Sequence, residues 1–264
     1  MPTEVTFTRS DGTVVPLVPE PFCQFCCKPI PDDFKTHAMC RDCNDHRDRV
    51  TPSPPYKMRI RDRSGHTRVE EFYTDARPYY FARAGAVGLY VKGKSLLFKE
   101  IWRLKGGRKD AELVAFHLAE CLSHVLHLRF EEFLKCEVLV PVPSGSGAAP
   151  APSQLLAKHL SRIDQGFDII EALEFVDEYS GQRQTASRRE REENPRGKVV
   201  LRPKSGNLRD KGVLLLDDTF VSGATTDECA KVLLQGGARE VYVLVVGRDV
   251  WPGWLKYINY SGGL

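Results

Sequence analysis

The chain has 264 residues, of which 42% are hydrophobic, so it can bury a core of its own and is not predicted to be disordered. Its 38 basic and 35 acidic side chains give a net charge of +3, too small for a protein that coats nucleic acid, so any anion site must be local. The first ten residues show no basic segment followed by an apolar one, and no run approaches 18 apolar residues. We therefore expect a cytoplasmic protein without membrane insertion.

The chain begins with a predicted β hairpin, because Val5–Thr8 and Val14–Val18 flank an Asp-Gly turn. The proline-rich stretch 51–55 cannot continue a helix or a central strand and is interpreted as the end of this N-terminal module. A second hairpin is predicted from Lys57–Arg61 and His66–Phe72, which a Ser-Gly turn separates. The predicted divisions are an N-terminal module (1–55) with this hairpin and the cysteine motifs described next, a linker and hairpin (56–84) and the main domain (85–264).

Five of the eight cysteines lie between positions 23 and 43, where they include two Cys-x-x-Cys pairs separated by 13 residues. Four thiolates at this spacing surround a tetrahedral Zn²⁺ and leave no open position, so we predict a structural metal site, with iron as the alternative ion. Cys27, His37 and His46 are further candidate ligands. The predicted ligands are Cys23, Cys26, Cys40 and Cys43. The other three cysteines lie in apolar surroundings and are interpreted as buried thiols: Cys121, Cys136 and Cys229.

Apolar residues at helical spacing predict helices at Lys94–Leu104 and Asp110–Leu128. His117 and His124 lie two turns apart in the second helix, too far to share a metal, and are interpreted as half-exposed. Downstream, short apolar runs without alternation are typical of strands buried on both faces of a parallel sheet. The predicted fold class is α/β, a doubly wound parallel sheet with a small N-terminal zinc-binding β module. The elements expected after the helices are Glu137–Val142, Gln154–Leu160, Ile169–Val176, Val213–Leu216, Thr226–Leu234 and Val241–Val246.

A polar loop between a buried strand and a helix is the strongest candidate site. Asp217 and Asp218 follow an apolar run, and two adjacent carboxylates can accept hydrogen bonds from both hydroxyls of a ribose. Ser222, Gly223 and Thr225 then allow backbone N–H groups to surround a phosphate at the helix start. The alternative is that these residues only cap the helix and form the turn, but the combination in this context favours the ribose-phosphate site.

The same segment, Val213–Thr226, resembles the phosphoribosyl pyrophosphate (PRPP) loop of type I phosphoribosyltransferases. The sequence is more similar still to the ComF family of competence-associated phosphoribosyltransferase-like proteins, which also carry an N-terminal pair of Cys-x-x-Cys motifs. Together with the loop, three further segments that resemble this family span most of residues 85–249: Val138–Pro143, Ser153–Ala157 and Gln184–Asn194.

The resemblance implies that Asp217 and Asp218 are the catalytic carboxylates, which hold the ribose hydroxyls, the second through water on a Mg²⁺ that enters with PRPP. It further implies a 5′-phosphate site in the residues that follow. The implied PRPP-binding residues are Asp217, Asp218, Thr219, Ser222, Gly223, Ala224 and Thr225.

Two other segments are expected to complete the site. The loop after Val142, with Pro143, Ser144 and Gly145, would face pyrophosphate, but it lacks the arginines usual in the ComF family, and a flexible Gly/Ser/Ala loop is an equal alternative. The polar segment Tyr179–Asp210 is expected to close as a lid over PRPP. Its implied catalytic cations, which stabilise departing pyrophosphate, are Arg188 and Arg189. An ordinary solvated helix with Glu–Arg pairs is the alternative for this segment.

Three functions remain open at this stage. The first is Mg²⁺-dependent transfer of phosphoribosyl to or from a nitrogenous base or amine. The second is a ComF-like accessory role in single-stranded DNA uptake or processing, with a basic groove around Arg183–Lys198. The third is a PRPP sensor without catalysis, and a fold alone cannot separate the three. The sequence also leaves a homodimer open, and Trp251 and Trp254 are interpreted as sealing the end of the core rather than stacking a base.

Overall fold

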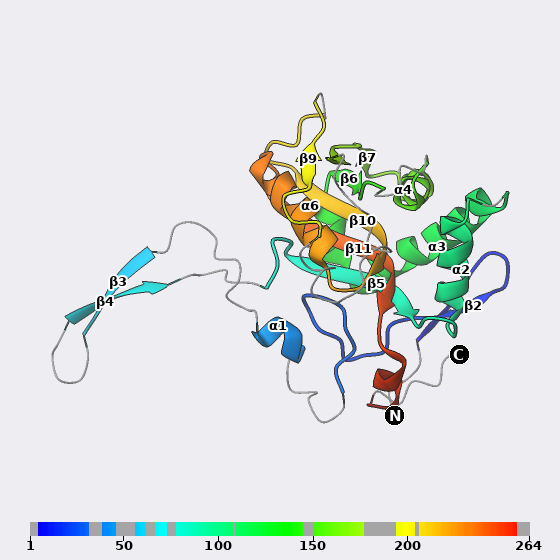
Figure 1. The fold of residues 1–264 in the computed structure, drawn as a ribbon, viewed down its shortest axis with the longest axis horizontal. Coiled ribbons are helices and arrows are strands. Elements are labelled where there is room, and N and C mark those ends of the chain that lie inside the picture. Colours follow the sequence, from blue (N-terminus) through cyan, green and yellow to red (C-terminus); the bar gives the residue numbers. More distant parts are fainter. Residues whose placement is uncertain are drawn as a thin grey trace.

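The computed structural model describes residues 5–31, 39–45, 56–61, 67–72, 78–107, 109–144, 150–176, 194–203 and 206–257. Its centre is a parallel sheet of five strands, which confirms the predicted α/β class (Figure 1). The neighbouring strands pair in parallel in the order β5, β11, β10, β6, β7. Their bounds are β5 Arg83–Tyr90, β6 Val138–Pro141, β7 Asp168–Ile169, β10 Gly212–Phe220 and β11 Glu240–Asp249.

Helices cover both faces of this sheet. Helices α3 and α4 pack against each other on one face, and α6 lies on the other (Figure 1). The chain moves from β6 outward to β7 but from β10 in the opposite direction to β11, so right-handed crossovers place their helices on opposite faces. The direction changes between β6 and β10, and ligands of such sheets bind beyond the strand ends at this point. The helices are α2 Leu96–Lys105, α3 Ala111–Arg129, α4 Pro152–Ile163 and α6 Ala224–Gln235.

The central strands form the core because their apolar runs are buried on both faces. All four residues of the run Val213–Leu216 are fully buried, and the run Val243–Val246 of β11 is buried beside them. The three cysteines outside the N-terminal module are also buried, as predicted. No helix in the described part of the chain is long and apolar enough to cross a membrane.

The N-terminal module packs directly on the edge strand β5. Strands β1 (Thr6–Thr8) and β2 (Val14–Pro16) form the predicted antiparallel hairpin. Beyond it, the Val18 N–H donates to the Val87 carbonyl at 2.9 Å. The Ala84 N–H donates to the Phe25 carbonyl at 2.9 Å. The module therefore protects an edge that would otherwise present unpaired backbone groups. The expected division at 84/85 falls inside β5.

Strand β5 was not among the predicted elements, and its composition explains why. Its sequence, RAGAVGLY, is rich in Ala and Gly, which are rare in strands. The packing requires these small residues. A Cβ on Gly85 would lie 2.8 Å from the Phe130 ring, and one on Gly88 would lie 2.5 Å from the Pro16 carbonyl oxygen.

The single strand predicted at Ile169–Val176 is wrong, because the chain leaves the parallel sheet after Ile169. A second strand, β8 (Leu173–Phe175), pairs antiparallel with β9 (Val199–Leu201) instead. The second predicted hairpin is confirmed as β3 (Tyr56–Arg61) and β4 (Thr67–Phe72).

Three short helices complete the described chain. The α-helix α1 spans Arg41–Asp45, and the 3₁₀ helices η2 and η4 span Glu131–Lys135 and Pro252–Tyr257. Trp251 is 74% exposed, so the interpretation of Trp251 as a seal is wrong, and the side chain of Trp254 lies outside the described residues. The buried side chains near this end are Val250 and Leu255.

Candidate functional site

The acidic pair lies within β10 rather than after it, because pairing with β11 continues past the apolar run. Asp217 stands opposite Val245, and Phe220 stands opposite Arg248. Successive residues of a strand face opposite sides of the sheet, so the side chains of Asp217 and Asp218 leave the strand in opposite directions. The backbone N–H of Asp218 donates to Asp217 Oδ1 at 2.8 Å, which ties the two residues together.

Asp218 is only 6% exposed and is held by two donors. Thr219 Oγ1 donates to Asp218 Oδ1 at 2.6 Å, and Lys105 Nζ lies 2.6 Å from the same oxygen. Lys105 comes from the end of α2 and also donates to Thr219 Oγ1 at 3.3 Å. The site thus contains a cation from a distant part of the sequence, which the sequence analysis did not identify.

The electrostatics of the pair follow from burial and proximity. Desolvation, and then the neighbouring Asp218 carboxylate, raise the pKa of Asp217 to about 8, although Lys105 opposes the shift. Burial alone would lower the pKa of Lys105, but the charges of Asp218 and Asp217 together raise it. A charged Lys105 beside a protonated Asp217 is the arrangement that these shifts favour near neutral pH.

The loop after β10 turns directly into α6. Gly223 is the N-cap of the helix, with φ at +82°, a conformation that glycine adopts without strain. The Ala224 N–H donates to Ser222 Oγ at 3.4 Å, and Thr225 lies in the first helical turn. A Cβ on Gly223 would lie 2.4 Å from the Phe220 ring, so the turn requires glycine. The N–H groups at the start of a 12-residue helix suit a phosphate.

A buried arginine fixes the start of this loop. Arg248, on β11, is 6% exposed and donates from Nη1 to the carbonyl oxygens of Phe220 and Val221, at 2.7 Å each. Tyr79 supports the loop from another direction, since its hydroxyl donates to the Ser222 carbonyl at 3.5 Å. The sequence signal for Arg248 was a basic residue shortly after the apolar run Val241–Val246.

Two consecutive buried acids near the start of α6 were not identified by sequence analysis. Asp227 Oδ1 accepts a hydrogen bond from the backbone N–H of Tyr80 at 2.6 Å. Glu228 Oε1 accepts one from the backbone N–H of Gly197 at 3.0 Å. The second contact joins α6 to a residue within the segment Tyr179–Asp210 that was predicted to be the lid. Arg188 and Arg189 lie outside the described residues.

The predicted pyrophosphate loop begins beside the acidic pair. The Val142 N–H donates to the Leu216 carbonyl at 2.9 Å, so the chain is still paired with β10 one residue before Pro143. The Ser153 hydroxyl donates to the Val142 carbonyl at 2.6 Å and fixes the end of this strand. Pro143 and Ser144 follow at the change of direction in the sheet, and Gly145 lies outside the described residues.

The four predicted cysteine ligands form one buried cluster, in which all sulfur atoms lie within 4.8 Å of one another. Zn–S bonds of about 2.3 Å at tetrahedral angles separate the sulfurs by roughly 3.8 Å. The Cys26 and Cys40 sulfurs are 3.6 Å apart, so the cluster fits a tetrahedral ion. Cys27 is buried but lies outside the cluster, and burial raises its pKa to about 12, whereas His37 and His46 lie outside the described residues.

The cluster favours a thiolate at Cys26 and adjoins the loop described above. Hydrogen bonds from Cys23, Cys40 and Cys43 lower the pKa of Cys26 well below its ordinary value, and Arg248 adds to this effect. Burial alone would lower the pKa of Arg248, but the contact with Cys26 contributes to raising it. The Arg248 guanidinium therefore influences both the candidate metal centre, through Cys26, and the loop after β10, through its hydrogen bonds.

Comparison with known proteins finds similar folds among solved structures. A structure of the allosteric regulatory enzyme of purine biosynthesis shares 17% identity over 72% of this chain and 35% of its own, with a TM-score of 0.37. A glutamine PRPP amidotransferase from B. subtilis shares 18% identity, also over 72% of this chain and 35% of its own, with a TM-score of 0.37. A purine phosphoribosyltransferase from Pyrococcus horikoshii shares 22% identity over 51% of this chain and 87% of its own, with a TM-score of 0.32.

The chain spans about a third of the length of the first two structures. Its sequence matches no protein-family model and no curated protein. The α/β class therefore rests on the order and direction of the strands themselves, and the candidate site rests on its own geometry.

Proposed function

We propose that this protein is a phosphoribosyltransferase of the ComF kind that binds PRPP with Mg²⁺ and transfers the phosphoribosyl group to or from a nitrogenous base or amine. One observation carries the proposal: two adjacent carboxylates, of which Asp218 is buried and Asp217 is half-buried, are followed by a glycine-started helix at the point where the sheet changes direction. Carboxylates suit ribose hydroxyls, and a helix start suits the 5′-phosphate.

The oxygen donors at Asp217 and Asp218 also suit Mg²⁺, which proteins bind through one or two carboxylates together with substrate phosphates. When bound with PRPP, the ion would neutralise part of the charge on pyrophosphate. Asp217 and Asp218 would hold the ribose hydroxyls, and residues Ser222–Thr225 would hold the 5′-phosphate through backbone N–H groups.

The proposed reaction needs no covalent intermediate with the protein. The acceptor nitrogen donates its lone pair to the anomeric carbon, and the bond from that carbon to pyrophosphate breaks with its electron pair on the departing oxygen. The carboxylates beneath the ribose would stabilise positive charge on the sugar ring in the transition state. Arg188 and Arg189 in the proposed lid would stabilise the negative charge of departing pyrophosphate, and the closed lid would exclude water from the reacting carbon.

The four-cysteine cluster would hold a structural Zn²⁺, because four thiolates leave no open coordination position for chemistry. Its position beside Arg248 assigns it a supporting role for the phosphate loop. We further propose that the protein works in the cytoplasm, where thiols stay reduced and available to zinc.

A panel assay tests the proposed activity. Purified protein is incubated with PRPP, Mg²⁺ and single nucleobases or amines, and released pyrophosphate is measured with Asp218→Asn as the control. We expect acceptor-dependent release by the wild-type protein and a loss of at least roughly 100-fold in the variant. Release that is independent of any acceptor, or that the variant retains, would contradict the proposal.

Single-stranded DNA is the rival ligand and is tested on the same two proteins. Salt-titrated fluorescence anisotropy with a labelled oligonucleotide measures its affinity. Binding that Asp218→Asn leaves unchanged or strengthens, in a protein that binds no PRPP, would favour the DNA role, because carboxylates repel a phosphodiester backbone.

A further inference from the structure

The ammonium group of Lys105 contacts the acidic pair of the candidate ribose site through Asp218. It lies 2.6 Å from Asp218 Oδ1 and 3.3 Å from Thr219 Oγ1. The side chain of Lys105 is 27% exposed and that of Asp218 is 9% exposed, so the ion pair is largely shielded from water. A contact this close and this sheltered differs from a surface ion pair, which solvent and salt weaken.

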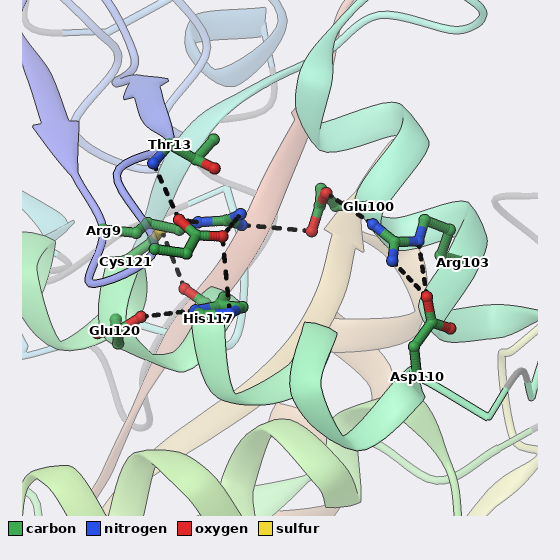
Figure 2. Close-up of polar contacts among 9 residues, drawn as sticks. Arg9, Thr13, Glu100, Arg103, Asp110, His117, Glu120 and Cys121 are labelled. Carbon is green, nitrogen blue, oxygen red and sulfur yellow. Dashed lines mark hydrogen bonds and ion pairs between the residues drawn. The ribbon is translucent and has the colours of Figure 1, made fainter.

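The helix that carries Lys105 is fixed along its length. Its N-cap, Ser95, accepts a hydrogen bond from the backbone N–H of Phe98 at 3.1 Å. In its middle, buried Glu100 accepts hydrogen bonds from Arg9 and Arg103, at 3.3 Å each (Figure 2). Arg9 belongs to the segment between β1 and β2, so these contacts lock α2 to the N-terminal hairpin.

A second set of contacts holds the C-terminal half of α2. Arg103 also donates from Nε to Asp110 Oδ2 at 3.2 Å, which ties the helix to the start of α3 (Figure 2). Ile101 and Leu104 are buried against the core. Lys105 is therefore presented to the acidic pair by a rigid element rather than by a loose surface segment.

The charge of Lys105 has a consequence for metal binding. A divalent ion or its water would approach the same carboxylate oxygen that the ammonium contacts, and two cations compete for one anion. The free acidic pair is then poorly suited to bind Mg²⁺ alone. The ammonium group supplies Asp218 with a positive charge and a hydrogen-bond donor. A ligand that carries a bound cation and hydroxyl groups can replace both.

We propose that Lys105 is the internal counter-ion of the ribose site. In the free protein, its ammonium group prevents divalent metal ions from binding to Asp218. When a metal–polyphosphate ligand with ribose hydroxyls binds, the ammonium group is displaced and the Asp218 carboxylate contacts the ligand instead. The inference rests on the proposed function for the identity of that ligand. Its direct consequence, the exclusion of free metal, concerns this chain alone and can be measured without PRPP.

The test uses Mn²⁺ as the probe and electron paramagnetic resonance to count the free ion. We expect the full-length Lys105→Met protein to bind Mn²⁺ roughly tenfold or more tightly than the wild type, because a charge-assisted competitor is gone. Lys105→Arg keeps the charge and should match the wild type. Lys99→Met removes an exposed lysine from the same helix and should also match it.

Two additions keep the outcome decisive. Adding Asp218→Asn to Lys105→Met should abolish the gained affinity, which assigns the new metal site to this carboxylate. If circular dichroism shows that Lys105→Met is unfolded, Lys105→Gln provides the second neutral variant. Equal Mn²⁺ affinity in the wild type and the folded neutral variant would overturn the inference. Absence of PRPP binding by the wild type would instead contradict the proposed function, so the two failures are distinct.

Discussion

Arg248 holds Phe220 in two ways: it donates to the Phe220 carbonyl at 2.7 Å, and its guanidinium lies 4.9 Å from the centre of the Phe220 ring. Phe220 is the last residue of β10, and its ring packs against Gly223. The charge of Arg248 also contributes to lowering the pKa of Cys26 in the four-cysteine cluster. The proposed phosphate loop and metal centre are therefore both influenced by one buried side chain.

Replacing this arginine should loosen the loop. Arg248→Met leaves the carbonyl oxygens of Phe220 and Val221 without their donor, which should lower the free energy of unfolding by about 2–4 kcal/mol. It should also weaken binding of ribose 5-phosphate. Arg239→Met removes an exposed arginine that adjoins the start of the same strand and should cost less than about 1 kcal/mol. Urea unfolding of both variants checks the prediction, and equal losses would contradict it.

The left-handed turn at Gly223 should tolerate no side chain. Gly223→Ala adds a Cβ 2.4 Å from the Phe220 ring at a φ of +82°, and we expect a loss of about 2–4 kcal/mol of unfolding free energy. Gly93→Ala has a similar φ of +76° but meets no atom within 4 Å, so it should cost only about 1 kcal/mol. The difference between the two measures the packing contribution, and no difference would show that Phe220 does not constrain the loop.

The four-cysteine cluster should bind one metal ion per chain. Cys26→Ala should abolish stoichiometric zinc and lower the free energy of unfolding by roughly 3 kcal/mol or more, because metal binding is coupled to folding of this module. Cys121→Ala makes the same substitution in a buried thiol of α3 and should retain the zinc. Elemental analysis and urea unfolding measure both. A metal-free wild-type protein, or zinc retained by Cys26→Ala, would contradict the assignment.

The raised pKa of Asp217 predicts a specific pH dependence. The folded protein keeps this proton up to a pH of about 8, whereas the unfolded chain loses it near the ordinary value of 3.8. Because the folded state then binds more protons between these limits, stability contributed by this group is present below pH 4 and is lost as the pH rises to about 8. Through this one group, the free energy of unfolding should change by no more than about 1.4 kcal/mol per pH unit.

Asp217→Asn should remove this contribution. Urea unfolding between pH 5 and pH 8, without added metal or ligand, should show that the variant gains stability relative to the wild type as the pH rises. Parallel curves for the two proteins would mean that Asp217 titrates alike in the folded and unfolded states.

The sequence predicted those elements that carry a clear local pattern, such as an apolar run or a pair of spaced cysteines. The run Val213–Leu216 revealed a buried strand, and the paired Cys-x-x-Cys motifs predicted a cluster that the structure brings together. Strand β5 gave no such signal, because its glycines serve the close approach of Phe130 and Pro16 rather than strand propensity. The continuation of β10 through its two aspartates depends on pairing with β11, which no local pattern encodes.

The two cations that contact the strand end and the loop of the candidate site could not be predicted from the sequence. Lys105 and Arg248 lie at the ends of elements whose packing decides which groups they meet. A lysine at the end of a helix is ordinarily a solvated residue that favours the helix dipole. Only the assembled sheet shows that this one contacts Asp218.

Calorimetric titration of Mg²⁺ and PRPP into the wild-type protein and Asp218→Asn tests the central proposal, that the Asp217–Thr225 segment holds a phosphorylated ribose. We predict saturable binding at one site in the wild type. Binding by the variant should be weaker by about 1–3 kcal/mol, the cost of a lost charge-assisted hydrogen bond at a buried position. Absence of saturable binding of PRPP to the wild type, or equal affinity in the two proteins, would contradict the assignment of this site.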